Sequence, residues 1–175
     1  KLLNPGAPVI VDPAMADNGK LYYGFDQAFV NEMKRLVAAS DVVLPNLTEA
    51  SFLTGIEYRE SGYDEAYILD QCRALCAIGA KTVVLTGTSF EAGKLGVTVY
   101  ESKTGKASYY FHERLPGISH GTGDVYASAF VGALMQQKSL FDAARIAADY
   151  TLSCIRYTKE DPDHWYGVKF EPLLP

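Results

Sequence analysis

The residues best suited to chemistry in this sequence form the run Gly121-Thr122-Gly123-Asp124, which stands directly before a predicted helix. Glycines leave backbone N–H groups unobstructed, and the amino end of a helix adds a partial positive charge, so this turn can bind phosphoryl oxygens. The Asp124 carboxylate can then take the proton from an attacking hydroxyl while the neighbouring amides hold the developing negative charge. The turn therefore predicts a phosphoryl transfer site with Asp124 as the catalytic base.

A structural explanation of the same residues stays open at this point. Thr122 or Asp124 caps the helix in that case, and the glycines only make a tight turn. His120, beside the turn, is a candidate phosphate contact, with a solvated histidine as the alternative. The chain contains no GxxxxGK[ST] sequence, so a Walker-type loop is excluded as the phosphate cradle.

Asn46 and Glu49 are the second group of candidates. They follow a predicted buried strand, at the carboxyl edge where open α/β sheets bind ligands. Mg²⁺ prefers oxygen ligands and is held by one or two carboxylates together with substrate phosphates and water, so Glu49 is predicted as a metal ligand. The alternative for Glu49 is a first-turn carboxylate that interacts with the helix dipole.

Polar residues also follow the two other predicted parallel strands. Asp12 and Asp17 come after the first of these strands, and Thr86 and Gly87 come at the end of the third. Each has an ordinary alternative, because aspartates form turns and Thr86 simply ends its strand. Since the carboxyl ends of parallel strands share one edge of a sheet, we expect these loops to converge on one crevice.

The elements that position these residues alternate between strand and helix. Short apolar runs predict buried strands at residues 8–13, 41–45 and 81–86, and helical spacing predicts helices over residues 25–39 and 64–78 and one starting at 46–48. Residues 14–24 are predicted as a polar loop with an Asn-Gly turn. This rhythm is typical of an α/β fold with a doubly wound, mostly parallel sheet and flanking helices.

The later part of the chain changes character. Residues 95–100 and 107–112 predict an antiparallel hairpin at the sheet edge, and helices are predicted over 125–137 and from 140 to about 158. The tail after residue 161 is expected to wrap the surface. We expect one domain spanning residues 1–175.

Composition narrows the class of protein. The 175 residues are 48% apolar and 12% aromatic, enough for one packed core and too few for two ordinary domains. A net charge of −5 gives no overall positive field to attract nucleic acid or an anionic membrane, and no run of apolar residues is long enough to span one. Three cysteines without metal-site spacing fit a reducing compartment, so we expect a cytoplasmic protein.

Four segments resemble the ribokinase-like kinases, and within them the pyridoxal kinases. These segments are VDPAMADNGKLY, DVVLPNLTEASFLTG, VVLTG and HGTGDVYASAFVGAL, in the order found in that family. The resemblance covers nearly the whole chain and implies ATP-dependent phosphorylation of the 5′-hydroxymethyl group of pyridoxal, pyridoxine or pyridoxamine. Hydroxymethylpyrimidine phosphate kinases, whose glycine loop commonly ends in cysteine, are the alternative within the fold. A non-catalytic nucleotide-binding module is the alternative of another class.

The resemblance also implies a role for each candidate residue. Asp124 is the implied base, with Gly121, Thr122 and Gly123 as the anion hole, Asn46 and Glu49 at the Mg²⁺-ATP phosphates, Asp12 and Asp17 near phosphates and metal, and Thr86 and Gly87 lining the nucleotide site. Leu44 departs from the threonine of some members, which removes one phosphate hydrogen bond. A homodimer is usual for the full-length members.

The resembling kinases are considerably longer, and their amino-terminal half supplies most residues that hold the vitamin ring. We therefore expect this chain to be the carboxyl-terminal portion of such a kinase, with a sheet edge left exposed. The isolated chain should be inactive or nearly so. A phosphorylation assay with each B6 vitamer checks this, and measurable turnover by the isolated chain would contradict it.

Overall fold

The computed structural model describes residues 4, 6–117, 120–161 and 163–174. The chain divides into two compact units, the first ending at Glu113 and the second beginning at Arg114. This division reflects the density of contacts, and the single domain expected from the sequence stays a prediction. None of the helices in the described parts of the chain has the length and apolar character needed to cross a membrane.

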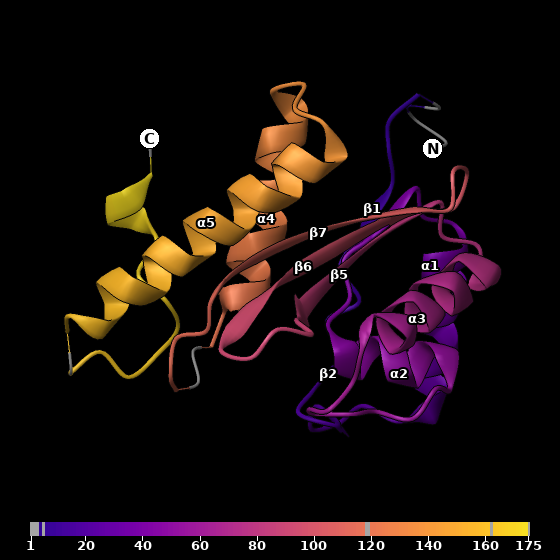
Figure 1. Cartoon of the computed structure of the whole chain (residues 1–175), viewed down its shortest axis with the longest axis horizontal. Coiled ribbons are helices and arrows are strands. Elements are labelled where there is room, and N and C mark those ends of the chain that lie inside the picture. Colours follow the sequence, from indigo (N-terminus) through magenta and orange to yellow (C-terminus); the bar gives the residue numbers. More distant parts are fainter. Residues whose placement is uncertain (1–3, 5, 118–119, 162, 175) are drawn as a thin grey trace. The chain divides into compact units, whose positions relative to one another are not determined.

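The first unit is built on a five-stranded mixed sheet (Figure 1). Its strands, in spatial order, are β1 (Ile10–Val11), β4 (Val42–Val43), β5 (Thr82–Thr88), β6 (Lys94–Glu101) and β7 (Lys106–Glu113). The first three strands pair in parallel, whereas β5, β6 and β7 pair antiparallel. The predicted strands and the predicted hairpin are therefore confirmed, although regular pairing of the first two strands covers only two residues each.

Three helices pack against one face of this sheet (Figure 1). They are α1 (Gln27–Ala38), α2 (Leu47–Thr54) and α3 (Glu65–Ile78). Each begins at a side-chain cap, provided in chain order by Asp26, Asn46 and Asp64. The core between helices and sheet consists of fully buried apolar side chains, among them Met15, Val30, Val37, Leu53, Ile68, Leu75, Val83 and Leu85.

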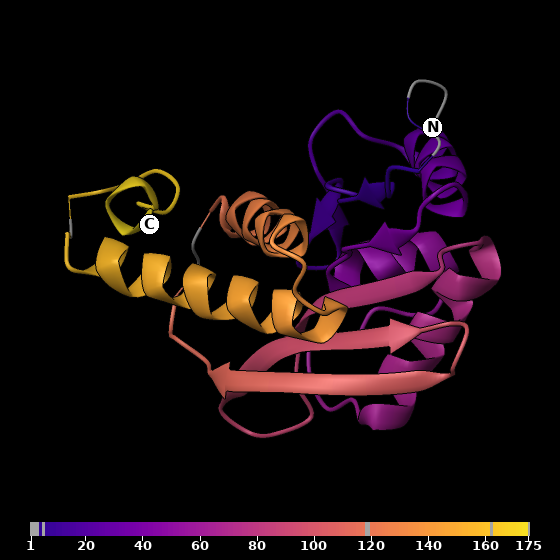
Figure 2. The ribbon, with the colours of Figure 1, turned by 90° about the horizontal axis from the view of Figure 1, so that it is seen from above.

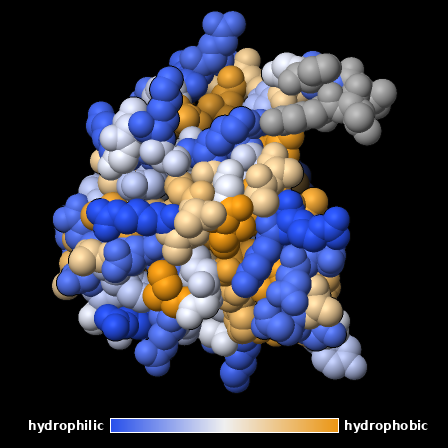
Figure 3. Space-filling view, turned by 90° about the vertical axis from the view of Figure 1, so that its right-hand side faces the viewer, coloured by the Kyte–Doolittle hydropathy of each residue, from blue (hydrophilic) through white to orange (hydrophobic). Residues whose placement is uncertain are grey.

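The outward surface of α1 and α3 is mainly polar, as amphipathic helices require, whereas α2 has no exposed residue. Val30, Met33 and Val37 carry the buried stripe of α1, whereas Leu36 on the same helix is exposed. Figure 3 views the molecule from the side on which Figure 1 shows α1 and α3. Hydrophilic side chains dominate the margins of that face, with hydrophobic ones between them.

The predicted loop over residues 14–24 is wrong in one respect, because it contains a small hairpin. Strands β2 (Ala16–Asp17) and β3 (Lys20–Leu21) pair antiparallel around Asn18 and Gly19. Both turn residues have positive φ, 50° and 75°, as a two-residue hairpin turn with an Asn-Gly sequence requires. The Asn-Gly signal was visible in the sequence, but strands of two residues carry no hydrophobic alternation from which to predict them.

The second unit is a pair of helices with a tail (Figure 2). Helices α4 (Thr122–Met135) and α5 (Leu140–Lys159) pack side by side, and buried alanines at 143, 144, 147 and 148 form much of the buried face of α5. The predicted bounds 125–137 are wrong for α4: the helix starts three residues earlier, and it stops before Gln137, whose φ is 62°.

The tail folds back on α5, as expected from the sequence. The Tyr150 hydroxyl donates a 3.0 Å hydrogen bond to the Phe170 carbonyl, and the Lys169 amide donates one of 2.7 Å to Thr158 Oγ1. A short 3₁₀-helix, η1 (Glu171–Leu173), follows these contacts. These hydrogen bonds hold the tail beside the carboxyl half of α5.

Gly96 lies in β6 where the backbone of β7 comes very close, so a substitution at this position tests the pairing of the two strands. A Cβ atom at this position would lie 1.9 Å from the Tyr110 carbonyl oxygen and 2.9 Å from Phe111 Cα, both in the backbone of β7. Gly96→Ala should therefore lower the free energy of unfolding by about 3 kcal/mol, measured by urea denaturation.

Gly132→Ala is the matched control. Gly132 is an exposed helical glycine of α4, and a methyl group added there would have no neighbouring atom within 4 Å, so alanine should stabilise by up to about 1 kcal/mol. Equal effects of the two substitutions would contradict the steric explanation.

Candidate functional site

The glycine turn forms the first turn of α4. Gly121 is the N-cap and has a φ of 76°, a left-handed conformation that favours glycine. Thr122 and Asp124 occupy the first and third helical positions, and no side-chain hydrogen bond caps the helix from Gly121. Thr122 and Asp124 therefore lie inside the helix and neither is the N-cap residue, while the tight glycine turn that the structural explanation also requires is present.

Asp124 lies at the wall of a cleft of about 650 Å³ in the second unit. Its side chain is exposed, and the cleft is also lined by Gly121, Tyr157, Tyr166, Lys169 and Phe170. The Asp124 carboxylate thus faces an open space at the amino end of a helix, where backbone N–H groups have no acceptor within the helix. This geometry suits a base that acts beside a bound anion.

The tail contributes cleft residues that sequence reasoning missed. Tyr166 and Lys169 line the cleft from the segment after residue 161, which carried no motif in the sequence. Lys169 pairs with Asp161, and this carboxylate raises the pKa of the lysine, so the ammonium group stays charged. Only the return of the tail along α5 brings these residues near the glycine turn, and no local sequence signal indicates it.

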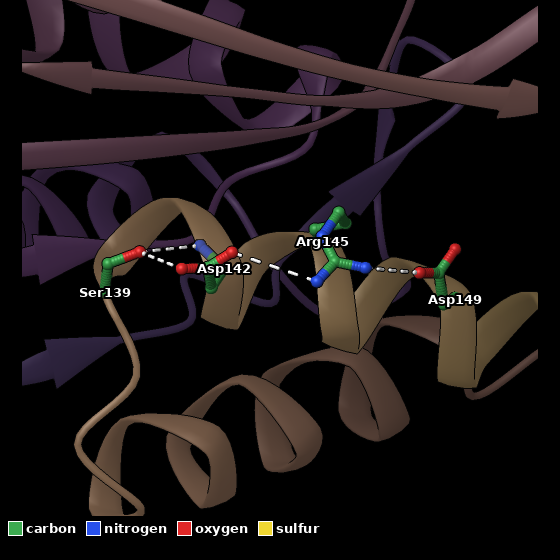
Figure 4. A network of polar contacts seen from close by, with 4 residues as sticks. All are labelled: Ser139, Asp142, Arg145 and Asp149. Atoms are coloured by element: carbon green, nitrogen blue, oxygen red, sulfur yellow. Dashed lines mark hydrogen bonds and ion pairs between the residues drawn. The ribbon is translucent and has the colours of Figure 1, made fainter.

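Helix α5 offers an internal comparison, because it also carries an aspartate at its third position (Figure 4). Ser139 Oγ accepts a 3.0 Å hydrogen bond from the Asp142 amide and donates one of 2.7 Å to the Asp142 carboxylate. Asp142 also lies 3.8 Å from Arg145, which reaches Asp149 at 3.4 Å. Asp142 is thus fully engaged in helix structure. No hydrogen bond or ion pair joins the Asp124 carboxylate to another of the residues that the structure describes.

Glu49 and Asn46 form a reciprocal cap at the amino end of α2. The Asn46 side chain accepts a 2.9 Å hydrogen bond from the Glu49 amide, and Glu49 Oε2 accepts one of 2.8 Å from the Asn46 amide. Glu49 Oε1 accepts a further bond of 3.2 Å from the Met15 amide. Glu49 thus lies in the first turn of α2, as its structural alternative predicted. Its burial also changes the pKa of its carboxyl group.

Burial of Glu49 raises the pKa of its carboxyl group to about 8, and the nearby Asp12 carboxylate acts in the same direction. The amides of Asn46 and Met15 favour the ionised form but do not outweigh the desolvation. Glu49 is only 4% exposed. A buried carboxyl group and a partly buried one, Asp12, therefore lie near each other, and each disfavours ionisation of the other.

Thr86 lies beside Asn46 at the ends of adjacent parallel strands. The two residues form a parallel bridge, and the Thr86 amide donates a 2.8 Å hydrogen bond to the Pro45 carbonyl. Gly87 follows at a bulge between Thr86 and Thr88, with a φ of 68° and an exposed position. The bulge shifts the register of pairing with β6 before the last pair, Thr88 with Gly96.

Asp17 has a different environment from the other acids. It lies in the β2–β3 hairpin, is exposed, and accepts hydrogen bonds of 2.9 and 3.0 Å from the backbone and side chain of Asn18. Its contacts are those of a turn residue. The first unit thus brings Asp12, Asn46, Glu49 and Thr86 together, whereas Asp124 and its glycine turn belong to the second unit.

The buried Glu49 carboxyl predicts a loss of stability as pH rises. Its pKa of about 8 in the folded protein lies above its ordinary value of 4.5, so across this window the folded state keeps a proton that the unfolded chain has released. The stabilising contribution is complete below pH 4.5, shrinks by up to about 1.4 kcal/mol per pH unit, and is gone above about pH 8.

Urea denaturation of the wild type and of Glu49→Gln across this window measures the effect. The glutamine does not titrate, so the free energy of unfolding of the wild type should fall relative to that of the variant as pH rises. A difference between the two proteins that stays constant with pH would contradict the raised pKa.

Comparison with known proteins is consistent with this geometry. The family model for phosphomethylpyrimidine kinase matches residues 1–168. Pyridoxal kinase of Arabidopsis thaliana is 28% identical over 91% of this chain and 51% of that protein. The hydroxymethylpyrimidine/phosphomethylpyrimidine kinase of Staphylococcus aureus is 25% identical over 87% of this chain and 54% of that protein. The chain spans about half the length of the curated relatives it matches.

Solved structures share the fold. A Bacteroides thetaiotaomicron protein assigned to the phosphomethylpyrimidine kinases superposes with a TM-score of 0.89, at 31% identity over 97% of this chain and 58% of that one. Pyridoxal kinase from Leishmania donovani, in complex with ADP and pyridoxine, gives a TM-score of 0.76 at 27% identity over 87% and 50% of the two chains. The α/β, ribokinase-like fold expected from the sequence is confirmed, and the chain belongs to the phosphomethylpyrimidine kinase family, whose relatives include the pyridoxal kinases.

Proposed function

We propose that this chain is the carboxyl-terminal portion of an ATP-dependent kinase that phosphorylates the 5′-hydroxymethyl group of pyridoxal, pyridoxine or pyridoxamine. The observation that carries the proposal is the exposed Asp124 carboxylate at the wall of a cleft, at the glycine-capped start of α4. Two comparisons support it: relatives named as pyridoxal kinases, and the Leishmania donovani enzyme, which was solved with ADP and pyridoxine.

In this proposal the residues of the second unit perform the transfer. Asp124 accepts the proton of the vitamin hydroxyl as this oxygen attacks the γ-phosphorus of ATP, the bond from that phosphorus to the β–γ bridging oxygen breaks, and ADP leaves. The amides of Gly121, Thr122 and Gly123 stabilise the charge on the transferring phosphoryl oxygens, since a helix start presents N–H groups to an anion. Base and anion hole therefore come from one turn and move as a rigid part of α4.

Residues of the first unit hold the nucleotide in this proposal. Asn46 and Glu49 serve the phosphates and Mg²⁺, Asp12 and Asp17 lie near the metal, and Thr86 and Gly87 line the nucleotide site. Asn46 and Glu49 would hold Mg²⁺ together with the phosphates, and the bound ion would supply positive charge that offsets the phosphate charge. ATP as donor is supported by the ADP bound to the Leishmania donovani enzyme.

The residues present fit Mg²⁺ bound mainly by substrate and water. Among the described residues no group of three or more His, Cys, Asp and Glu side chains is arranged to hold a metal. Mg²⁺ usually takes only one or two carboxylates and completes its shell with phosphates and water. The buried Glu49 carboxyl beside Asp12 is such a pair, and the repulsion between them gives a cation a favourable place.

A second candidate substrate is hydroxymethylpyrimidine or its phosphate. The matching family model and the relative from Staphylococcus aureus favour it. Asp124 favours the B6 vitamers, because the pyrimidine kinases commonly have cysteine at the end of the glycine loop. A form of the Bacteroides thetaiotaomicron protein crystallised with pyridoxal supports the same choice. Turnover of each substrate by the complete enzyme separates the two candidates.

The remaining features of the proposal concern the whole protein. We propose a single domain that includes residues 1–175, a homodimeric and cytoplasmic enzyme, and no nucleic-acid or membrane partner. The net charge of −5 supports the absence of a nucleic-acid partner, since it provides no general attraction for a phosphate backbone.

Asp124→Asn in the complete enzyme tests the proposed base. Turnover should fall by about 10²-fold or more, while binding of ATP measured by calorimetry stays near that of the wild type, because asparagine fills the same space without accepting the proton. A non-catalytic nucleotide-binding module would show no turnover in either protein.

Asp142→Asn is the matched control, because Asp142 occupies the same third helical position in α5 and is held by Ser139 and Arg145. This variant should lose at most about 1 kcal/mol of stability, with turnover of the folded protein unchanged. If Asp124→Asn behaves like this control, Asp124 has a structural role only and the proposed mechanism is wrong.

A further inference from the structure

The segment that carries Asp17 is attached to the amino end of α2 by three hydrogen bonds. Glu49 and Asn46 make two of them, to the Met15 amide and, at 2.9 Å, to the Ala16 carbonyl. The third involves Thr48, whose Oγ1 accepts a 3.1 Å hydrogen bond from the Gly19 amide in the turn of the β2–β3 hairpin. Residues of one helical turn thus hold successive parts of the hairpin.

Tyr58 covers the same turn. A Cβ atom on Gly19 would lie 3.0 Å from Tyr58 Cδ1 and 3.2 Å from Cε1, so the ring lies directly over the glycine. Thr48 also lies near the Tyr58 hydroxyl and acts to lower its pKa. Burial raises the pKa of Tyr58, and the charge of Asp17 is among those that raise it further, which places Asp17 near the ring.

The hairpin needs this support because it is very small. Its strands contain two residues each, and its turn residues Asn18 and Gly19 both have positive φ. Isolated two-stranded hairpins are marginal in water even when their strands are longer. Thr48, which is 2% exposed, and Tyr58 therefore provide much of what keeps the hairpin in one position.

We propose that Thr48 and Tyr58 are positioning residues of the Mg²⁺-nucleotide site. They hold the β2–β3 hairpin on the amino end of α2, so that Asp12 before the hairpin and Asp17 within it keep their positions relative to Glu49. Neither residue needs to contact metal or nucleotide. This inference rests on the proposed function, which assigns these acids to the metal.

The central variant is Thr48→Val in the complete enzyme, which keeps the shape of the side chain and removes the acceptor for the Gly19 amide. Hydrogen exchange should become about fivefold faster at that amide, as expected for the loss of one hydrogen bond. The Mn²⁺ concentration for half-saturation in the presence of ADP, measured by electron paramagnetic resonance, should rise about fivefold. The kcat at saturating Mg²⁺ should stay within about twofold of the wild type.

Three further variants isolate the cause. Thr48→Ser restores the hydroxyl and should restore Mn²⁺ binding, and Tyr58→Phe keeps the ring over Gly19 and should give a smaller effect than Thr48→Val. Thr54→Val is the control, because this threonine lies on the same helix and bonds Gln71 instead of the hairpin. It should lower the melting temperature without changing the half-saturating concentration of Mn²⁺.

The outcomes separate this inference from the proposed function. If the wild-type enzyme binds no Mn²⁺ with ADP, the proposed metal site is wrong and the positioning role falls with it. If the wild type binds Mn²⁺ and Thr48→Val binds it equally well, or if Thr54→Val weakens it as much, the positioning role alone is overturned.

Discussion

The first unit of this protein depends on one buried carboxylate, that of Glu49. Its two oxygens accept backbone N–H groups from the start of α2 and from the segment after β1, so one side chain ties together a helix and a loop that are far apart in sequence. The same burial makes the ionised form unfavourable, with a pKa near 8. A group that is costly to ionise, beside a second acid, is a common feature of sites that bind cations or protons.

The second unit depends on a contrast between two helix starts. In α5 a serine caps the helix and donates a hydrogen bond to the carboxylate of the aspartate at the third position. In α4 a left-handed glycine takes the place of the serine, and the aspartate at the same position lines an open cleft. The exchange of a capping side chain for glycine thus accompanies a different environment for the aspartate at the third position.

The sheet explains why several loops of the first unit gather at one edge. Parallel pairing of β1, β4 and β5 places the chain segments after them at the same end, which brings Asn46 beside Thr86. A bulge at Gly87 then shifts the register of pairing with β6 near that edge, and Thr88 pairs with Gly96 beyond it. Antiparallel pairing then places the connection between β5 and β6 at this same end, and it returns the end of β7, Glu113, beside the start of β6.

Much of this arrangement could be predicted from the sequence. Valine-rich runs predicted the strands, helical spacing and capping residues predicted the helices, and Asn46 before Glu49 is a recognisable capping pattern. The order of strands and helices predicted a doubly wound, mostly parallel sheet, because connections between parallel strands follow few routes. The ribokinase-like fold was implied by the resemblance of four sequence segments to that family. Gly121 and Asp124 could be singled out because their chemistry depends on a local turn.

Other features were decided only by tertiary structure. The sequence does not reveal that Glu49 is buried beside Asp12, that the tail returns to line the Asp124 cleft with Tyr166 and Lys169, or that Tyr58 covers Gly19. Each depends on the packing of segments that are distant along the chain, where burial and distance determine charge and contact. Local sequence determines which residues can act and how the backbone turns around them, whereas desolvation and proximity arise only when separate segments meet.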